Sequence, residues 1–196
     1  HITLMGYRKS QNWKGLLHNI WFFIWEDNSI ESWIVNVIIA FVLVKFVIYP
    51  LLGLLLSTSF PVVAVVSGSM EHNGLNFDEW WAEKQSWYEG NGITKEMMIN
   101  FRMHNGFNKG DIIVLRGVKP EKIKPGDIIV YSTDRYKYPI IHRVIEANSP
   151  SFRTKGDNNA GFDPSPVDEK QVVGKAAFKI PLLGWIKILF TNIIGG

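Results

Sequence analysis

One uninterrupted apolar stretch near the N-terminus dominates the pattern of hydrophobic and polar positions along the chain. Of the 23 residues from Ile34 to Leu56, 17 are Ile, Val, Leu or Phe. At ~1.5 Å per residue, a helix of this length spans the roughly 30 Å hydrocarbon layer of a bilayer. The pattern therefore predicts a transmembrane helix over residues 34–57, and its length argues against a buried core helix.

Lys45, Pro50 and Gly53 are the residues of this predicted span that bear most on whether a helix can insert and continue. Lys45 lies near its middle, where a charge costs about 2.5–3.5 kcal/mol on the insertion scale, whereas each aliphatic side chain returns about 0.3–0.6 kcal/mol. The many small gains outweigh one charge, so we expect the segment to insert into a membrane. Pro50 and Gly53 are expected to bend or end the helix.

The charges on either side of the span predict its orientation. Arg8, Lys9 and Lys14 precede the span, whereas the next basic residue after it is Lys84. The positive-inside rule then places the N-terminus in the cytoplasm and the chain after the span outside, as a single-pass protein of the cell membrane. Within residues 1–33, basic and bulky apolar positions fit an amphipathic helix at the membrane surface, or a helix packed on the soluble domain.

After the span, the pattern changes to short apolar runs separated by turn residues. Five runs rich in Val and Ile are typical of β-strands. Because no long helical pattern separates most of them, the sequence predicts a mainly β fold, an antiparallel β domain over residues 58–180. The five predicted strands are residues 61–66, 111–116, 127–132, 140–146 and 172–179.

Two segments do not fit the strand pattern. Residues 73–108 are rich in aromatic side chains and are expected to form one or two short amphipathic helices. This insertion either buries its own aromatic side chains or forms a flap that touches the membrane or guides a substrate. Residues 181–196 are apolar but contain Lys187 and are too short for a full span, so they fit a membrane-proximal segment or the start of a second span.

The composition excludes several classes of chemistry. The 196 residues contain no cysteine, which excludes disulfides, thiolate catalysis and cysteine-based zinc sites. The five histidines are not paired at the spacing of zinc ligands, and no cofactor or metal is expected. The formal net charge of +3 is small and the basic residues are scattered, so the charge pattern indicates no nucleic-acid partner.

Three short motifs carry candidate chemistry. Ser67-Gly68-Ser69-Met70 ends the first predicted strand, where a serine on a tight turn can lie beside backbone N–H groups that stabilise an oxyanion. His142 lies on a predicted strand, where a half-desolvated imidazole stays neutral near pH 7 and can accept a proton. Asp157 and Asp163 share a loop rich in Gly and Asn, and either carboxylate can orient that imidazole. Taken alone, the three motifs also fit an ordinary turn, a core histidine and a calcium loop.

The order of these motifs resembles that of the type I signal peptidases. The resemblance runs from about Ile34 to about Gly184. His142 stands where the bacterial enzymes carry a lysine, which is typical of the archaeal and endoplasmic-reticulum branch. One departure is His72, at a position that is usually proline in this family. The motifs that follow the membrane span are Ser67-Gly68-Ser69-Met70, Lys109-Gly110-Asp111, Ile141-His142-Arg143-Val144 and Gly156-Asp157-Asn158.

The resemblance implies a role for individual residues. It implies Ser69 as the nucleophile, His142 as its general base and Asp163 as the acid that orients the histidine. Asp157 is implied as a second required carboxylate. Ser67 is implied to lie close to the oxyanion hole, where it acts together with the backbone N–H of Ser69.

The activity that the resemblance implies is that of a membrane-bound serine endopeptidase that removes N-terminal signal peptides from exported preproteins. Its expected partners are preprotein signal peptides and the lipid membrane, and the sequence does not identify accessory subunits. The family also implies small residues at the first and third positions before the cut. The alternative is an exported, membrane-anchored β module that binds partners without catalysis.

Overall fold

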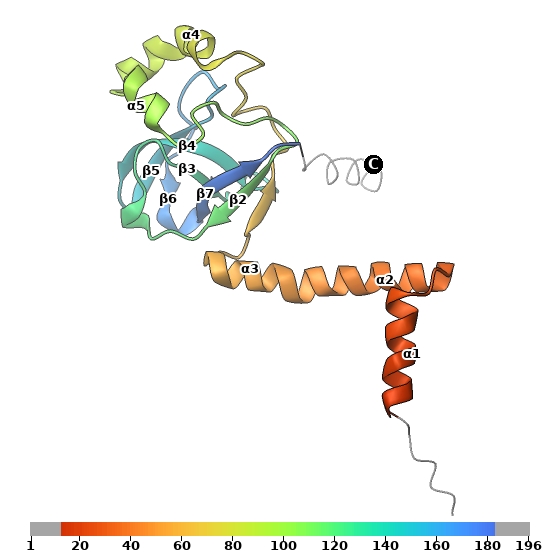
Figure 1. Cartoon of the computed structure of the whole chain (residues 1–196). Coiled ribbons are helices and arrows are strands. Elements are labelled where there is room, and N and C mark those ends of the chain that lie inside the picture. The colour runs from red at the N-terminus through yellow and green to blue at the C-terminus, as the bar shows by residue number, and fades with distance from the viewer. Residues whose placement is uncertain (1–12, 183–196) are drawn as a thin grey trace, which may run out of the picture. The chain divides into compact units, whose positions relative to one another are not determined.

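The computed structural model describes residues 13–182 (Figure 1). The chain divides between Leu51 and Leu52 into two compact units, a helical N-terminal unit and a C-terminal unit built on a β-sheet. Because the described residues end at 182, almost all of the apolar segment 181–196 lies outside them. The N-terminal helices are α1 (Trp13–Trp25), α2 (Ile30–Leu43), the π-helix η1 (Val44–Ile48) and α3 (Tyr49–Leu56).

Hydrogen bonds fix the corner between α1 and α2. The Ser32 hydroxyl donates to the backbone carbonyl of Phe23. Asn36 Nδ2 donates to the backbone carbonyl of Ile24 at 2.9 Å. The last carbonyls of a helix have no partner within the helix, so polar side chains from α2 satisfy the end of α1.

From α2 to α3 the chain forms one continuous apolar helix. It runs from Ile30 to Leu56, 27 residues, and its most apolar 18-residue window has a mean hydropathy of 2.5. Most of its large apolar side chains are exposed. The structure thus contains the long apolar helix that the sequence predicted, and a helix with this length and surface indicates membrane association.

The helix does not end at Pro50 or Gly53, although an end there was one of the two expected outcomes. The residues directly before Pro50 form a π-helix, in which the N–H of Tyr49 donates to the carbonyl of Val44. Proline has no N–H and interrupts the regular ladder of helical hydrogen bonds. The π-helix, whose turn is wider than that of an α-helix, lies directly before this proline. The helix therefore continues through the proline and ends at Leu56.

The C-terminal unit is built on one antiparallel sheet of seven strands (Figure 1). The strand order is β1-β2-β7-β3-β4-β5-β6, and all six pairings are antiparallel. This confirms the predicted mainly β, antiparallel fold. The strands are β1 (Val62–Ala64), β2 (Ile112–Arg116), β3 (Ile128–Tyr131), β4 (Ile140–Asn148), β5 (Ser151–Lys155), β6 (Val167–Asp168) and β7 (Val172–Ile180), with 3₁₀ turns η2 (Pro120–Lys122) and η3 (Glu169–Gln171).

All five predicted strands are present, but the sequence did not predict β5 and β6. β5 reads Ser-Phe-Arg-Thr-Lys, with Phe152 as its one large apolar residue. It forms because it is the return strand of a hairpin with β4, from Asn148 opposite Ser151 to Arg143 opposite Lys155. Tertiary pairing overrides weak local propensity here.

The central strand β3 shows how the sheet encloses its core. All four of its residues are buried. Ile128 and Val130 belong to one hydrophobic cluster, whereas Ile129 and Tyr131 belong to another. Since alternate residues of a strand point to opposite faces, β3 is covered on both faces. Such a strand gives the neighbouring β4 a rigid support.

The insertion forms two helices, as expected: α4 (Phe77–Gly90) and α5 (Lys95–Asn100). A capping box begins α4, in which the side chain of Asn76 accepts from the N–H of Glu79 and the Glu79 carboxylate accepts from the N–H of Asn76. The insertion buries several of its aromatic side chains. Its cluster comprises Trp80, Trp81, Tyr88, Ile93 and Met98, together with Ile145 of β4.

Candidate active site

Ser69 lies on a tight turn five residues past the end of the edge strand β1. The N–H of Glu71 donates to the carbonyl of Gly68 at 3.1 Å, which closes this turn. Met70 is 0% exposed and fixes the turn to the hydrophobic core. Ser69 itself is half-buried, and its Oγ lies 3.2 Å from Oγ of the exposed Ser67. The turn therefore presents two hydroxyl groups side by side.

The loop after β5 is hydrogen-bonded to the turn that carries Ser69. The backbone N–H of Asn158 donates to the carbonyl of Ser69 at 2.9 Å, and its Nδ2 donates to the carbonyl of Gly68 at 3.1 Å. A Cβ at Gly156 would lie 2.6 Å from the carbonyl oxygen of Ser69, so the chain approaches too closely for any other residue. The Gly-Asp-Asn motif thus fixes the backbone that carries Ser69.

His142 lies on β4 next to the same loop. Arg143 pairs with Lys155 across β4 and β5, so His142 and Gly156 each lie one residue beyond the last pair of this ladder. Gly156 is also the residue in close approach to Ser69. The sheet register therefore brings the segments of Ser69 and His142 to one common neighbour. The imidazole is buried, with 6% of His142 exposed.

Asp163 is the carboxylate that contacts this imidazole. Its Oδ2 lies 2.7 Å from His142 Nδ1. Tyr131 Oη and Thr154 Oγ1 donate to the same oxygen at 2.9 Å and 2.6 Å. Burial raises the pKa of Asp163, but the hydrogen bonds from His142 and from the two hydroxyl groups hold it below its usual value. An ionised carboxylate on Nδ1 favours the tautomer with a proton there, which leaves Nε2 as a proton acceptor.

Asp157 has a different set of contacts. It forms two hydrogen bonds with the guanidinium of Arg143, at 2.9 Å from Nε and 2.6 Å from Nη2, and both side chains are 0% exposed. Burial raises the pKa of Asp157, but the charge and hydrogen bonds of Arg143 outweigh burial and hold it well below its usual range. Arg143 also donates to the carbonyls of Arg102, Met103 and Gly126. This ion pair joins the loop after β5 to two other loops of the domain.

Comparison with known proteins places these features in a family. No protein-family model matches the chain. The signal peptidase complex catalytic subunit SEC11 of Scheffersomyces stipitis is 30% identical to it over 159 residues, which cover 75% of this chain and 75% of that protein. The chain belongs to the type I signal peptidase family, in its endoplasmic-reticulum and archaeal branch.

Two further signal peptidase relatives match shorter stretches. Human SEC11C is 29% identical over 108 residues, covering 49% of this chain and 56% of that protein. SEC11 of Lachancea thermotolerans is 36% identical over 107 residues, covering 47% of this chain and 62% of that protein. Both are also named as catalytic subunits of a signal peptidase complex.

Sequence reasoning missed three side chains of this signal peptidase that hold the two aspartates. Tyr131 and Thr154 contact Asp163, and Arg143 contacts Asp157. A signal for Arg143 exists in the sequence, because a charged residue inside the apolar run Ile-Ile-His-Arg-Val-Ile needs a buried partner. Nothing in the sequence marks Tyr131 or Thr154, whose importance depends on the pairing of β3, β4 and β5.

In the signal peptidase domain, the side chain of His72 lies beside the buried Asp157 rather than beside His142. Its Nε2 is 3.6 Å from Asp157 Oδ2. Its ring stacks on the ring of Trp80, with 3.9 Å between centroids. The residue that replaces the usual family proline is therefore part of the packing between α4 and the loop after β5.

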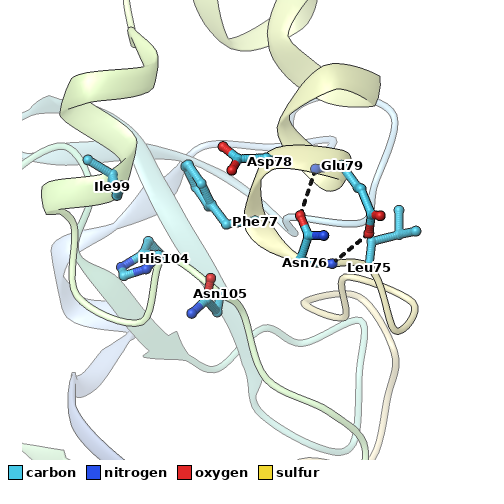
Figure 2. A pocket seen from close by; sticks show the side chains of 8 residues that line it. All are labelled: Leu75, Asn76, Phe77, Asp78, Glu79, Ile99, His104 and Asn105. Carbon is cyan, nitrogen blue, oxygen red and sulfur yellow. Dashed lines mark hydrogen bonds between the residues drawn. The ribbon is translucent and has the colours of Figure 1, made fainter.

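A surface cavity of about 680 Å³ lies in the insertion, and it is lined by residues other than those of the candidate active site. Figure 2 shows the N-terminal turn of α4 on one side of it, with the hydrogen bonds between Asn76 and Glu79. The ring of Phe77, the first residue of α4, points toward His104, and the two rings meet edge to face. None of the candidate catalytic residues line this cavity, so it plays no part in the chemistry argued below.

Proposed function

We propose that this chain is a membrane-bound serine endopeptidase that removes N-terminal signal peptides from exported preproteins. Its nucleophile is Ser69, its general base is His142, and Asp163 orients the base. One observation carries the proposal: Asp163 contacts His142 Nδ1 at 2.7 Å, while the loop between β5 and Asp163 is bonded to the backbone of Ser69. The membership in the signal peptidase family supports the same activity.

The proposed reaction proceeds through an acyl-enzyme. Ser69 Oγ attacks the carbonyl carbon of the scissile bond while His142 Nε2 takes its proton, and the resulting imidazolium is stabilised by Asp163. The oxyanion accepts hydrogen bonds from the backbone N–H of Ser69 and from the hydroxyl of Ser67. The imidazolium then donates its proton to the leaving amine. Water, activated by the same imidazole, hydrolyses the ester and frees Ser69.

The substrate is proposed to bind as an added strand. β1 is the edge strand of the sheet, paired on one side with β2. Val66, two residues past β1, is 50% exposed and precedes the serine turn. An extended peptide that pairs along this edge would reach Ser69 with its scissile bond. Small residues at the first and third positions before the cut are expected, as in the family.

The proposed setting is a membrane with the catalytic unit outside the cytoplasm. The long apolar helix supports a single-span anchor, and the basic residues before it support an N-terminus in the cytoplasm. Anchoring enzyme and preprotein in one membrane raises their effective concentration. The relatives are named as subunits of a complex, so further subunits are proposed as partners.

Cleavage of a purified preprotein in vesicles tests this function. The full chain should release the mature protein with one defined new N-terminus, identified by mass spectrometry. A membrane-anchored binding module, the competing function, would bind the preprotein but leave it intact. Intact preprotein after prolonged incubation with folded, membrane-inserted chain would contradict the proposal.

Asp163→Asn should lower kcat by about 10²- to 10⁴-fold, because a neutral amide no longer favours the required tautomer or stabilises the imidazolium. The measurement is the initial rate of preprotein cleavage at saturating substrate. Asp127→Asn is the matched control, since Asp127 forms an ion pair with Lys175 at 2.7 Å in the same domain. Equal cleavage rates for Asp163→Asn and Asp127→Asn would show that Asp163 has no role in the mechanism.

A further inference from the structure

The inserted helix α4 packs directly on the loop that carries both aspartates, residues 156–163, here called the aspartate loop. The rings of Trp87 and Phe162 meet edge to face, with 5.0 Å between centroids. The guanidinium of Arg153 lies 3.5 Å from the centroid of the same Phe162 ring. Phe162 directly precedes Asp163 in the sequence. One side chain from α4 and one from β5 therefore hold the residue next to the carboxylate that contacts His142.

A second set of contacts holds the start of the aspartate loop. The buried hydroxyl of Tyr88, also on α4, donates to Asp157 Oδ1 at 3.1 Å. The ammonium of Lys155 lies 4.9 Å from the ring of Trp87 and 4.8 Å from the ring of Tyr88. The same ammonium donates to the carbonyls of Gly156 and Asp157. Helix α4 thus contacts the aspartate loop at both of its ends.

The composition of the aspartate loop explains why it needs such support. It reads Gly-Asp-Asn-Asn-Ala-Gly-Phe-Asp, and Gly and Asn leave a backbone with many accessible conformations. Its only large apolar side chain is Phe162. The N–H of Asp163 donates to the carbonyl of Thr154 at 2.8 Å, which holds the backbone at that point. The ring of Phe162 is therefore the main apolar contact that resists movement of the loop's second half.

We propose that α4 is a positioning element for the aspartate loop, and that Trp87 is a positioning residue that acts through Phe162 on Asp163. The inference rests on the proposed role of Asp163. Without the ring of Trp87, Asp163 would occupy the 2.7 Å contact with His142 for a smaller fraction of time. Misplacement by about 1 Å is enough to lower a catalytic rate by on the order of 10²-fold. Binding along the edge of β1 does not involve Trp87, so KM should stay the same.

The test compares Trp87→Ala with Trp81→Ala in the full chain. Trp81 lies on the same helix, is more deeply buried, and its ring contacts are to Phe77, Trp80 and Tyr88. Trp87→Ala should lower kcat by roughly 10- to 100-fold with KM unchanged, and Trp87→Phe should restore most of the rate. Trp81→Ala should lower the melting temperature but leave kcat near the wild-type value at temperatures well below unfolding.

Hydrogen exchange gives a readout that does not depend on activity. In Trp87→Ala, the amide of Asp163 should exchange faster than in the wild type, whereas in Trp81→Ala it should not. Phe162→Leu removes the contact from the side of the loop and should reproduce both effects if Trp87→Ala fails to fold. Equal kcat in the Trp87→Ala and Trp81→Ala variants, with wild-type exchange at Asp163, would overturn the positioning role. Absence of cleavage by the wild type would contradict the proposed function instead, and the exchange data would still test the contact.

Discussion

Ser69→Ala is expected to reduce preprotein cleavage by on the order of 10⁴- to 10⁶-fold, down to the background that substrate binding and the oxyanion donors provide. The change removes the proposed nucleophile and one contact, the 3.2 Å approach to Ser67 Oγ. Because Ser69 is half-buried and its backbone contacts remain, the fold should persist. The measurement is the initial rate of cleavage, with the melting temperature recorded in parallel.

Ser67→Ala is the matched control for this variant. It deletes the same hydroxyl group two residues away on the same turn. As a proposed oxyanion donor, Ser67 should contribute about 10²- to 10³-fold, so the variant keeps a measurable rate and still forms the acyl-enzyme. Cleavage by Ser69→Ala at the rate of Ser67→Ala or faster would exclude Ser69 as the nucleophile.

Asp157→Asn should destabilise the catalytic unit by about 3–5 kcal/mol, the usual cost of leaving one member of a buried ion pair without its partner. Arg143 and Asp157 are both 0% exposed, so the guanidinium would keep its charge without a counter-ion or water. The measurement is chemical or thermal unfolding of the catalytic unit within the full chain. Loss of activity in this variant should follow loss of folded protein.

An exposed ion pair provides the control for this prediction. Asp78 and Lys95 lie 2.8 Å apart, with side chains that are 76% and 50% exposed. Asp78→Asn should change the free energy of unfolding by less than about 1 kcal/mol, because water solvates both charges. If Asp157→Asn is as stable as Asp78→Asn, the buried ion pair does not hold the aspartate loop to the domain.

The stability difference at Asp157 should depend on pH in a defined direction. Its folded pKa is held below the value of about 3.9 for a free aspartate, so the unfolded chain binds its proton first as the pH falls. The contribution of the carboxylate is therefore fully present above about pH 4 to 5 and is lost as the pH falls towards the folded pKa. The gap in stability between wild type and Asp157→Asn should be constant near neutral pH and shrink in acid.

The features that the sequence predicted well are those with a local physical signal. A long apolar run predicted the continuous helix, since only composition and length decide it. Alternating Val and Ile runs predicted five of the seven strands. Local signals were weaker at β5, where one Phe stands among polar residues, and at Pro50, where a π-helix lets the chain continue. Those outcomes depend on strand pairing and on a non-standard turn that no short window encodes.

The candidate site shows the same division. The resemblance to the signal peptidases pointed to Ser69, His142 and both aspartates, but the loop composition alone left open which aspartate contacts the imidazole. The alternation of side chains along β4 determines this: Arg143 and His142 are neighbours on a strand, so their side chains point to opposite faces. Asp157 pairs with Arg143, and Asp163 pairs with His142. Only the three-dimensional pairing separates the structural ion pair from the contact to the imidazole.

A double-mutant cycle measures whether Ser69 and His142 work as one unit. Ser69→Ala, His142→Ala and the double variant are compared by kcat for preprotein cleavage, with folding verified for each. If the imidazole acts by taking the serine proton, the second substitution costs nothing once the first is made, and all three variants share one residual rate. Near wild-type cleavage by His142→Ala, or losses that multiply in the double variant, would show that the two side chains act separately and would contradict the proposed site.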